Sequence, residues 1–313
     1  MKLIKWIGIF LFALILLVGG YALFRKNHFI SKEEAIATYR FPNSQFVDWE
    51  GIKVHILEQG NGGQTVVLIH GLGGALHEFN PLAEKLAQKY HVVSFDLPGF
   101  GLSDAPIHTT DIQQVYADFM NFILENYTPD SCYVIGNSMG GMIAWNTALL
   151  HPDQVQKLVL LAPAGYDMVA IAEKNAEWIN QPQIKFLLAK GAAPFIAKTN
   201  VEMCFYDDTQ IDPILIERKY GMMNKEGNLA YLRQLAGYKD FMDTIAIQQI
   251  QTPTLLIWGT EDEIIPYSHA ARFERDLPNN TFLTYKNCGH APMLEELDKC
   301  GKDVLEFFEV KYN

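Results

Sequence analysis

The sequence predicts an α/β fold: helices cover both faces of a mostly parallel, doubly wound sheet, a helical lid is inserted into it, and one transmembrane helix precedes it. Three observations support this prediction. From residue 45 onward, short apolar, β-branched runs alternate with helical patterns. The strand pattern is missing from residues 164–247 and resumes at residue 254. An uncharged apolar stretch precedes the whole domain.

The first 26 residues are predicted to be a membrane anchor. Residues 6–24 carry no charged side chain, and as a helix they would rise roughly 28 Å, close to the roughly 30 Å hydrocarbon core of a bilayer. A cleaved signal peptide is the competing interpretation, but residues 19–22 match its small-residue cleavage site poorly. Basic residues are balanced on the two sides of the segment, so its orientation in the membrane stays open. Whether the segment is cleaved also stays open.

The connector and the core follow. Residues 27–44 are polar, and Ser31 is a suitable N-cap for a short helix over residues 32–39. Gly51 joins the first two predicted strands, residues 45–50 and 53–59. Further strands are predicted at residues 65–69, 91–95, 132–135, 157–161, 254–258 and 281–285, with helices at 78–90, 112–126 and 139–150. These elements define a core of residues 45–163 and 248–313, interrupted by the lid at 164–247.

Composition excludes several classes of protein. With 49% hydrophobic and 19% charged residues, the chain can bury a sizeable core, which excludes a disordered protein. The formal net charge of −11 does not attract phosphate backbones, so we expect no nucleic-acid partner. The four cysteines contain no Cys-x-x-Cys pair, which gives no support to a metal site, and a Cys288–Cys300 bridge stays open.

A G-x-S-x-G motif at residues 136–140 follows a predicted strand and opens a predicted helix. The chain must turn sharply there, and the glycines remove the Cβ atoms that would clash in such a turn. This turn lifts the hydroxyl of Ser138 above the sheet, with the helix N-terminus beneath it. The motif therefore predicts Ser138 as a nucleophile, whereas a glycine-rich turn without chemistry would need no partners elsewhere in the chain.

Two partners follow in the order Ser…Asp…His that such a site requires. His290 comes just after the last predicted strand, and a serine hydroxyl needs a base that titrates near neutrality. An acid is expected after the strand that ends at residue 258, where Glu261, Asp262 and Glu263 compete. The strand-end register favours Asp262, whose task would be to hold the imidazole tautomer and to stabilise the imidazolium.

A glycine-rich loop follows the first parallel strand. Residues 70–74 read His-Gly-Leu-Gly-Gly, and glycines let backbone N–H groups point at an oxyanion. We expect the N–H groups of Leu72 and Met139 to supply the two donors of an oxyanion hole. His70 is expected to shape this loop rather than to transfer protons.

With these residues in place, residues 46–308 resemble the α/β-hydrolase superfamily. Residues 96–103 look like the turn after that family's fourth strand, and the resemblance implies a structural role for Asp96. Residues 258–266 are similar to the family's acid loop, which again implies Asp262. Epoxide hydrolases and haloalkane dehalogenases have aspartate at the nucleophile position, so the resemblance implies a serine hydrolase with Ser138 as its nucleophile.

Within the superfamily, residues 136–141 resemble the elbow of meta-cleavage-product C–C hydrolases and equally that of monoacylglycerol lipases. The C–C enzymes usually have tryptophan after the catalytic histidine, whereas Ala291 follows His290 here. Their glycine loop tends to read H-G-x-G-P-G, whereas residues 70–75 read H-G-L-G-G-A. The anchor and residues 162–165 are similar to membrane-bound monoacylglycerol lipases.

Residues and resemblance together predict an esterase or lipase that cleaves lipophilic carboxylic esters, such as monoacylglycerols, through an acyl-enzyme. This reaction needs no metal or organic cofactor. The expected partners are a small lipophilic ester and, through the N-terminal helix, a membrane; the oligomeric state stays open. The alternatives are C–C bond hydrolysis, a non-catalytic membrane-tethered receptor on the same fold and a peptidase acting on amino-terminal residues.

Overall fold

A computed structural model describes residues 27–106, 111–167, 188–235 and 244–311, together with residues 173, 177, 181, 182 and 184. The predicted membrane anchor, residues 1–26, lies outside the described residues. Within the part of the chain that is described, no helix combines the length and the apolar character needed to span a bilayer.

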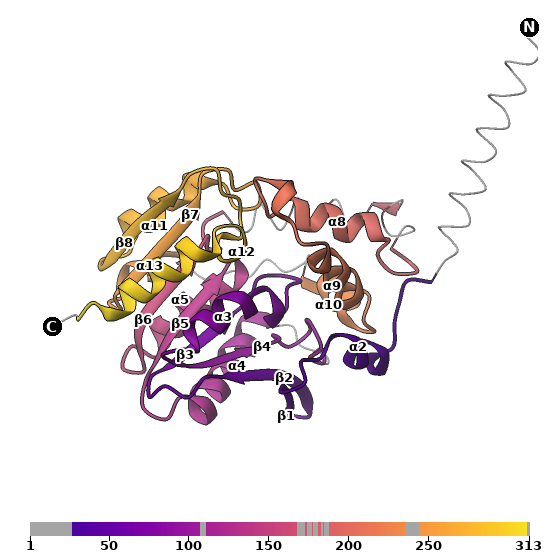
Figure 1. The fold of residues 1–313 in the computed structure, drawn as a ribbon, viewed down its shortest axis with the longest axis horizontal. Helices are drawn as coiled ribbons and strands as arrows, with labels where there is room; N and C mark the ends of the chain where they lie inside the picture. The colour runs from indigo at the N-terminus through magenta and orange to yellow at the C-terminus, as the bar shows by residue number, and fades with distance from the viewer. Residues whose placement is uncertain are drawn as a thin grey trace, which may run out of the picture.

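The described residues contain one eight-stranded sheet with the strand order β1-β2-β4-β3-β5-β6-β7-β8 (Figure 1). Its strands are β1 (Gln45–Trp49), β2 (Ile52–Gln59), β3 (Thr65–Ile69), β4 (His91–Phe95), β5 (Cys132–Asn137), β6 (Val155–Leu161), β7 (Thr254–Gly259) and β8 (Asn280–Tyr285). β2 pairs antiparallel with β1 and with β4, and every pair from β4 to β8 is parallel. The mostly parallel sheet that the sequence predicts is therefore confirmed.

Helices cover both faces of this sheet, as predicted. One face packs against α4 (Ile112–Tyr127), α5 (Met139–Leu150) and α11 (Ala270–Asp276) through a core that includes Phe119 and Trp145. The other face packs against α3 (Asn80–Leu86), α12 (Pro292–Glu295) and α13 (Leu297–Glu309). All residues of β3 and β7 are buried, which explains why these strands read as continuous apolar runs rather than alternating ones.

Helices dominate the described part of residues 164–247. It contains α8 (Pro194–Glu202), η2 (Asp208–Gln210), α9 (Pro213–Met223), α10 (Asn228–Leu235) and the beginning of η3 (Thr244–Gln249). In Figure 1, α8, α9 and α10 lie together beside the sheet. Two buried side chains attach this group to the loop after β4: Lys225 donates to the Ser103 carbonyl at 2.7 Å, and Asn228 to the Gly101 carbonyl at 2.9 Å.

The connector packs against the same group. Ser31 caps α2 (Lys32–Tyr39) by accepting the Glu34 N–H, which confirms the predicted short helix. The backbone N–H groups of His28 and Ile30 donate to the carbonyls of Lys190 and Asn224, so the chain just before α2 is hydrogen-bonded to the helical group.

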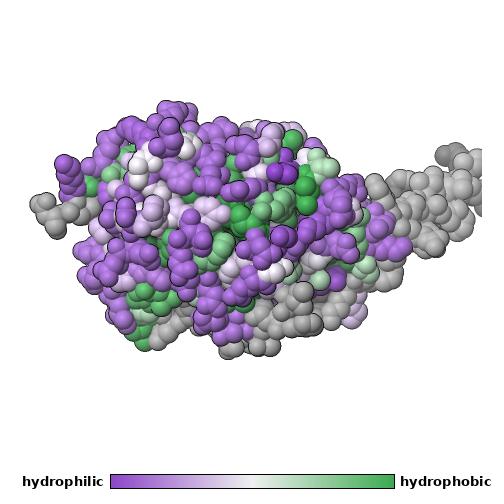
Figure 2. Space-filling view, turned by 90° about the horizontal axis from the view of Figure 1, so that it is seen from below, coloured by the Kyte–Doolittle hydropathy of each residue, from purple (hydrophilic) through white to green (hydrophobic). Residues whose placement is uncertain are grey.

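Some predicted boundaries are wrong. The helix predicted over residues 78–90 is instead the short turn η1 (Leu76–Glu78) followed by α3, because Pro81 lacks an N–H and suits only the first turn of a helix. The Cys288–Cys300 bridge does not form, and both cysteines are free thiols. The face seen in Figure 2 is mostly hydrophilic with small hydrophobic patches, in keeping with a charged, acidic exterior around the two cores.

Candidate active site

Ser138 stands at a strained turn between β5 and α5. Its φ of 57° lies in the left-handed region, which non-glycine residues rarely adopt. A Cβ on Gly136 would lie 2.2 Å from the Gly140 carbonyl oxygen, and one on Gly140 would lie 2.1 Å from the Ile69 carbonyl oxygen. Both glycines are therefore required for the close approach that holds Ser138 in this conformation.

His290 and Asp262 form a buried pair. His290 Nδ1 lies 2.8 Å from Asp262 Oδ2, and the other carboxylate oxygen accepts the N–H groups of Ile264 and Ile265, both at 2.9 Å. A carboxylate at Nδ1 fixes the proton on that nitrogen and leaves Nε2 as the basic one. Asn137 also donates to the His290 carbonyl at 3.0 Å, so both the ring and its backbone are held. Of the three acids that compete in the sequence, the structure brings Asp262 to His290.

A single cavity of about 870 Å³ has both Ser138 and His290 in its wall. Its lining is mainly apolar and comes both from the core and from the lid helices α8, α9 and α10. Six methionines contribute to it: Met139, Met142, Met203, Met222, Met223 and Met293. Because methionine is flexible and polarisable, such a wall adapts to apolar ligands of different shape.

The glycine loop lies next to Ser138. A Cβ on Gly71 would come within 3.1 Å of Ser138 Cβ, and Leu72 and Met139 both line the cavity. Neither the Leu72 N–H nor the Met139 N–H has an acceptor among the described residues. His70 fixes this loop, because its Nδ1 contacts the Gly71 carbonyl at 2.8 Å while its Nε2 accepts the Leu97 N–H at 2.9 Å.

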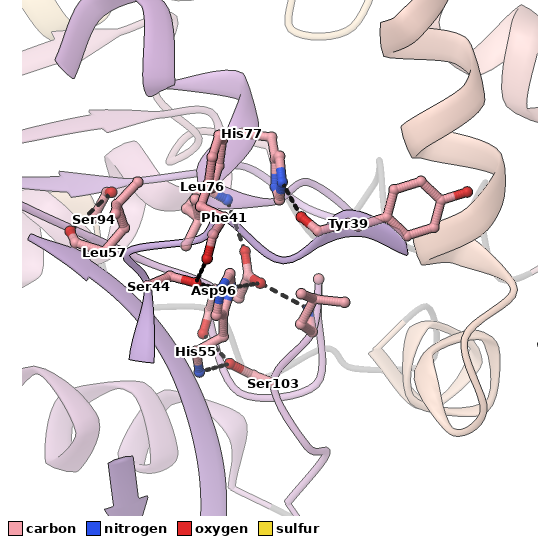
Figure 3. Close-up of polar contacts among 12 residues, drawn as sticks. Tyr39, Phe41, Ser44, His55, Leu57, Leu76, His77, Ser94, Asp96 and Ser103 are labelled. Carbon is pink, nitrogen blue, oxygen red and sulfur yellow. Dashed lines mark hydrogen bonds and ion pairs between the residues drawn. The ribbon is translucent and has the colours of Figure 1, made fainter. Parts of the chain in front are cut away.

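Asp96 is the centre of a buried network behind this loop (Figure 3). Its carboxylate accepts the N–H groups of Leu76 at 2.8 Å and Leu102 at 2.7 Å, and it pairs with His55 Nδ1 at 2.8 Å. His55 Nε2 in turn lies 2.7 Å from Ser44 Oγ. Burial alone would raise the pKa of Asp96, but the adjacent His55 holds that pKa well below its usual range. The network ties the connector to the loops after β3 and β4.

Two further histidines belong to the wall of this cavity, although no sequence motif indicated either of them. His77 and His269 both line the cavity. His77 Nε2 donates to the Tyr39 carbonyl at 2.8 Å, and burial lowers the pKa of His77 to about 4. Neither histidine is part of a short sequence motif, so only the structure reveals that both line the cavity.

The burial of His77 predicts a pH-dependent stability. The unfolded chain binds a proton at this histidine near pH 6.5, whereas the folded chain does so only near pH 4. The free energy of unfolding should therefore fall as the pH drops through this window, by up to about 1.4 kcal/mol per pH unit. Urea unfolding at several pH values should show a flatter dependence for His77→Gln than for the wild type, and equal slopes would contradict this explanation.

Besides Ser138, the cavity wall contains a second side chain with a nucleophilic atom, the thiol of Cys204. Burial raises the pKa of its thiol to about 11, so the thiolate is scarce near neutral pH and the side chain is a weak nucleophile.

Among the described residues, no group of three or more His, Cys, Asp or Glu side chains could hold a metal ion.

Comparison with known proteins gives consistent matches. Residues 64–297 match the family described as the alpha/beta hydrolase fold. A 2-hydroxy-6-oxononadienedioate/2-hydroxy-6-oxononatrienedioate hydrolase of Klebsiella pneumoniae subsp. pneumoniae is 30% identical over 286 residues, which covers 87% of this chain and 96% of the relative.

Two solved structures share the fold. A serine hydrolase involved in carbazole degradation is 25% identical with a TM-score of 0.72, and the match covers 86% of this chain and 99% of that one. A membrane phospholipase A is 24% identical with a TM-score of 0.71, and the match covers 96% of this chain and 97% of that one.

Proposed function

This chain belongs to the α/β-hydrolase fold family, and from that premise we propose that it is a serine hydrolase with Ser138 as nucleophile, His290 as base and Asp262 as the acid that orients His290. One observation carries the proposal: the wall of one cavity contains both the strained Ser138 and the histidine of the buried His290–Asp262 pair.

The proposed reaction proceeds in two halves. Ser138 Oγ attacks the substrate carbonyl carbon while its proton passes to His290 Nε2, and the resulting oxyanion is stabilised by the N–H groups of Leu72 and Met139. Collapse of this intermediate breaks the bond to the leaving group, which takes the proton from His290. Water then adds to the acyl-enzyme with His290 as base, which releases the acid and restores the Ser138 hydroxyl.

The preferred substrate class is a lipophilic carboxylic ester. The methionine-rich, mainly apolar cavity suits an acyl chain, whose transfer from water contributes about 0.8 kcal/mol for each buried CH₂. Leu72 and Met203 line the cavity and are also exposed, so apolar side chains lie where the cavity wall meets the surface. Esters such as monoacylglycerols fit this description.

Hydrolysis of a carbon–carbon bond in a vinylogous diketone is the second candidate. The Klebsiella relative and several others are named as hydrolases of 2-hydroxy-6-oxononadienedioate. These names support the carbon–carbon reaction better than they support cleavage of a monoacylglycerol. The same serine, histidine and aspartate would serve either reaction.

A membrane tether is part of the proposal. It rests on residues 6–24, which lack charged side chains, and on the exposed Leu72 and Met203 in the cavity wall. A tether of this kind would deliver lipophilic esters from the bilayer to the opening.

Parallel assays of the purified full chain distinguish the two reactions. We expect turnover of p-nitrophenyl esters that increases with acyl length from acetate upward, and slower consumption of a 2-hydroxy-6-oxodienedioate. Rapid cleavage of the dienedioate with negligible turnover of every ester would instead assign the second candidate. Absence of both activities in a folded protein would contradict the proposal of a serine hydrolase.

A further inference from the structure

The lid helix α9 places two neighbouring cations in the wall of the catalytic cavity. Both Arg218 and Lys219 line it, although the rest of the wall is mainly apolar. The Lys219 side chain is only 11% exposed. No described residue accepts a hydrogen bond from Lys219 Nζ or from the Arg218 guanidinium within 3.5 Å, so two strong donor groups in this wall lack acceptors there.

Lys219 reaches the glycine loop beside Ser138. Its ammonium lies 3.9 Å from the position that a Cβ on Gly73 would occupy, and Gly73 is one residue beyond Leu72, a proposed oxyanion donor. Its ion-pair partner is Glu78, at 3.6 Å from Nζ to Oε1, which is too long for a hydrogen bond. The cation is therefore close to the proposed reaction centre and only loosely paired.

The other carboxylates of the wall do not neutralise these cations. Asp167 pairs with Arg272 at 2.6 Å, and Glu263 is an exposed residue in the loop after β7. Of the carboxylates in the cavity wall, Glu78 is thus the one that pairs with a cation of α9. Within the wall, the two cations of α9 therefore share one nearby carboxylate, and a charge without a close partner is costly in a partly desolvated place.

We infer that Arg218 and Lys219 bind an anionic oxygen group of the substrate, a phosphate or a carboxylate, close to the bond that is cleaved. Such a group would bring a negative charge to the side of the wall where the two cations lie, and the guanidinium and the ammonium supply the donors that it requires. This inference rests on the proposed hydrolase function and deepens it, because it favours an anionic ester over a neutral monoacylglycerol. A phosphate on a lipid headgroup and a free carboxylate both present such an anion.

Three esters with the same acyl chain test the inference: the monoesters of glycerol, of glycerol 3-phosphate and of glyceric acid. We expect kcat/KM of the wild type to be at least about tenfold higher for one or both anionic esters than for the glycerol ester. A preference for the phosphate ester or for the glycerate ester identifies which anion the site takes. Equal kcat/KM for all three esters would overturn the inference.

Substitutions of Arg218 and Lys219 provide a second, independent test of the inference. Lys219→Met and Arg218→Met should each lower the ratio of anionic to neutral kcat/KM by about tenfold or more, whereas Lys219→Arg should retain most of it. Glu78→Gln removes the competing carboxylate and should raise the ratio. Lys198→Met, on the exposed side of α8, serves as the matched lysine control and should leave the ratio unchanged.

Labelling of Ser138 by a fluorophosphonate separates this inference from the proposed function. Labelled variants are folded and carry a reactive serine, so an unchanged ratio in a labelled Lys219→Met protein overturns the anion site alone. If Lys219→Met is not labelled, the ratios of the Lys219→Arg and Glu78→Gln proteins decide. A wild-type protein that is not labelled contradicts the proposed serine hydrolase itself.

Discussion

Ser138→Ala is expected to lower kcat by about 10⁶-fold while leaving the fold intact, because the variant lacks the oxygen that forms the acyl-enzyme. The change removes one oxygen atom from a half-buried side chain and keeps the Cβ, and therefore the backbone strain, so the free energy of unfolding should change little. Hydrolysis of a long-chain ester and circular dichroism measure the two effects. Ser131→Ala, just before β5 and outside the cavity lining, is the matched control.

His290→Ala should cause a loss of similar size, since Ser138 and His290 act as a unit. The double variant is then expected to lose little more than either single variant, because the residual rate comes from binding and from the oxyanion donors. Losses that multiply in the double variant would mean that the two side chains act independently. Such a result would exclude the proposed proton transfer between them.

Asp96→Ala is expected to lower the free energy of unfolding by about 3–5 kcal/mol, the usual cost of removing one partner from a buried ion pair. The change leaves His55 buried without its carboxylate and deprives the N–H groups of Leu76 and Leu102 of their acceptor. Urea unfolding at neutral pH measures the loss. Glu309→Gln, in an exposed pair with Lys89, should leave the urea midpoint essentially unchanged.

Acid should reduce the difference between the Asp96→Ala protein and the wild type. The pKa of Asp96 is lowered in the folded chain, so its carboxylate stabilises the fold above the unfolded pKa of about 4 and loses this effect as the pH falls towards the lower folded value. The gap between the two proteins should therefore narrow below about pH 4. A gap that stays constant down to the acid transition would contradict the role given to this carboxylate.

Motifs that combine a turn with its chemistry could be predicted from the sequence. Gly136 and Gly140 are needed because neighbouring backbone lies about 2 Å from where their Cβ atoms would be. The motif marks both glycines, although only the contact of Gly136 with Gly140 is local in sequence, and Gly140 is crowded by Ile69 at the end of β3. The preference for Asp262 over its acidic neighbours follows from strand register, which is also local. Both predictions concern where residues lie, and their catalytic roles remain proposals to be tested.

Contacts between distant segments could not be predicted in this way. His77 lines the cavity because α2 and α9 pack near it, and Arg218 and Lys219 become neighbours of the glycine loop only through the packing of the lid helices. No sequence pattern marks these positions, since α9 carries polar and apolar residues without a motif. The residues expected to select the substrate can therefore be found only from the tertiary structure. The residues expected to perform the reaction can be found from local sequence motifs.

The fold itself allows both an ester and a carbon–carbon substrate, because either reaction begins with attack of the same serine on a carbonyl carbon. The positive charges near the glycine loop are compatible with both candidate substrates. A dienedioate and a phosphate-bearing ester both present the anion that Arg218 and Lys219 would bind, so the acyl-chain and headgroup assays decide between them more directly than further comparison of folds.

Peptide mass spectrometry of the full chain after brief treatment with a fluorophosphonate tests the central claim most directly. We expect a single adduct on the peptide that contains Ser138, formed in parallel with the loss of ester hydrolysis, and no adduct on Cys204. Complete loss of activity with the adduct on another residue, or full activity after Ser138 has been modified, would contradict it.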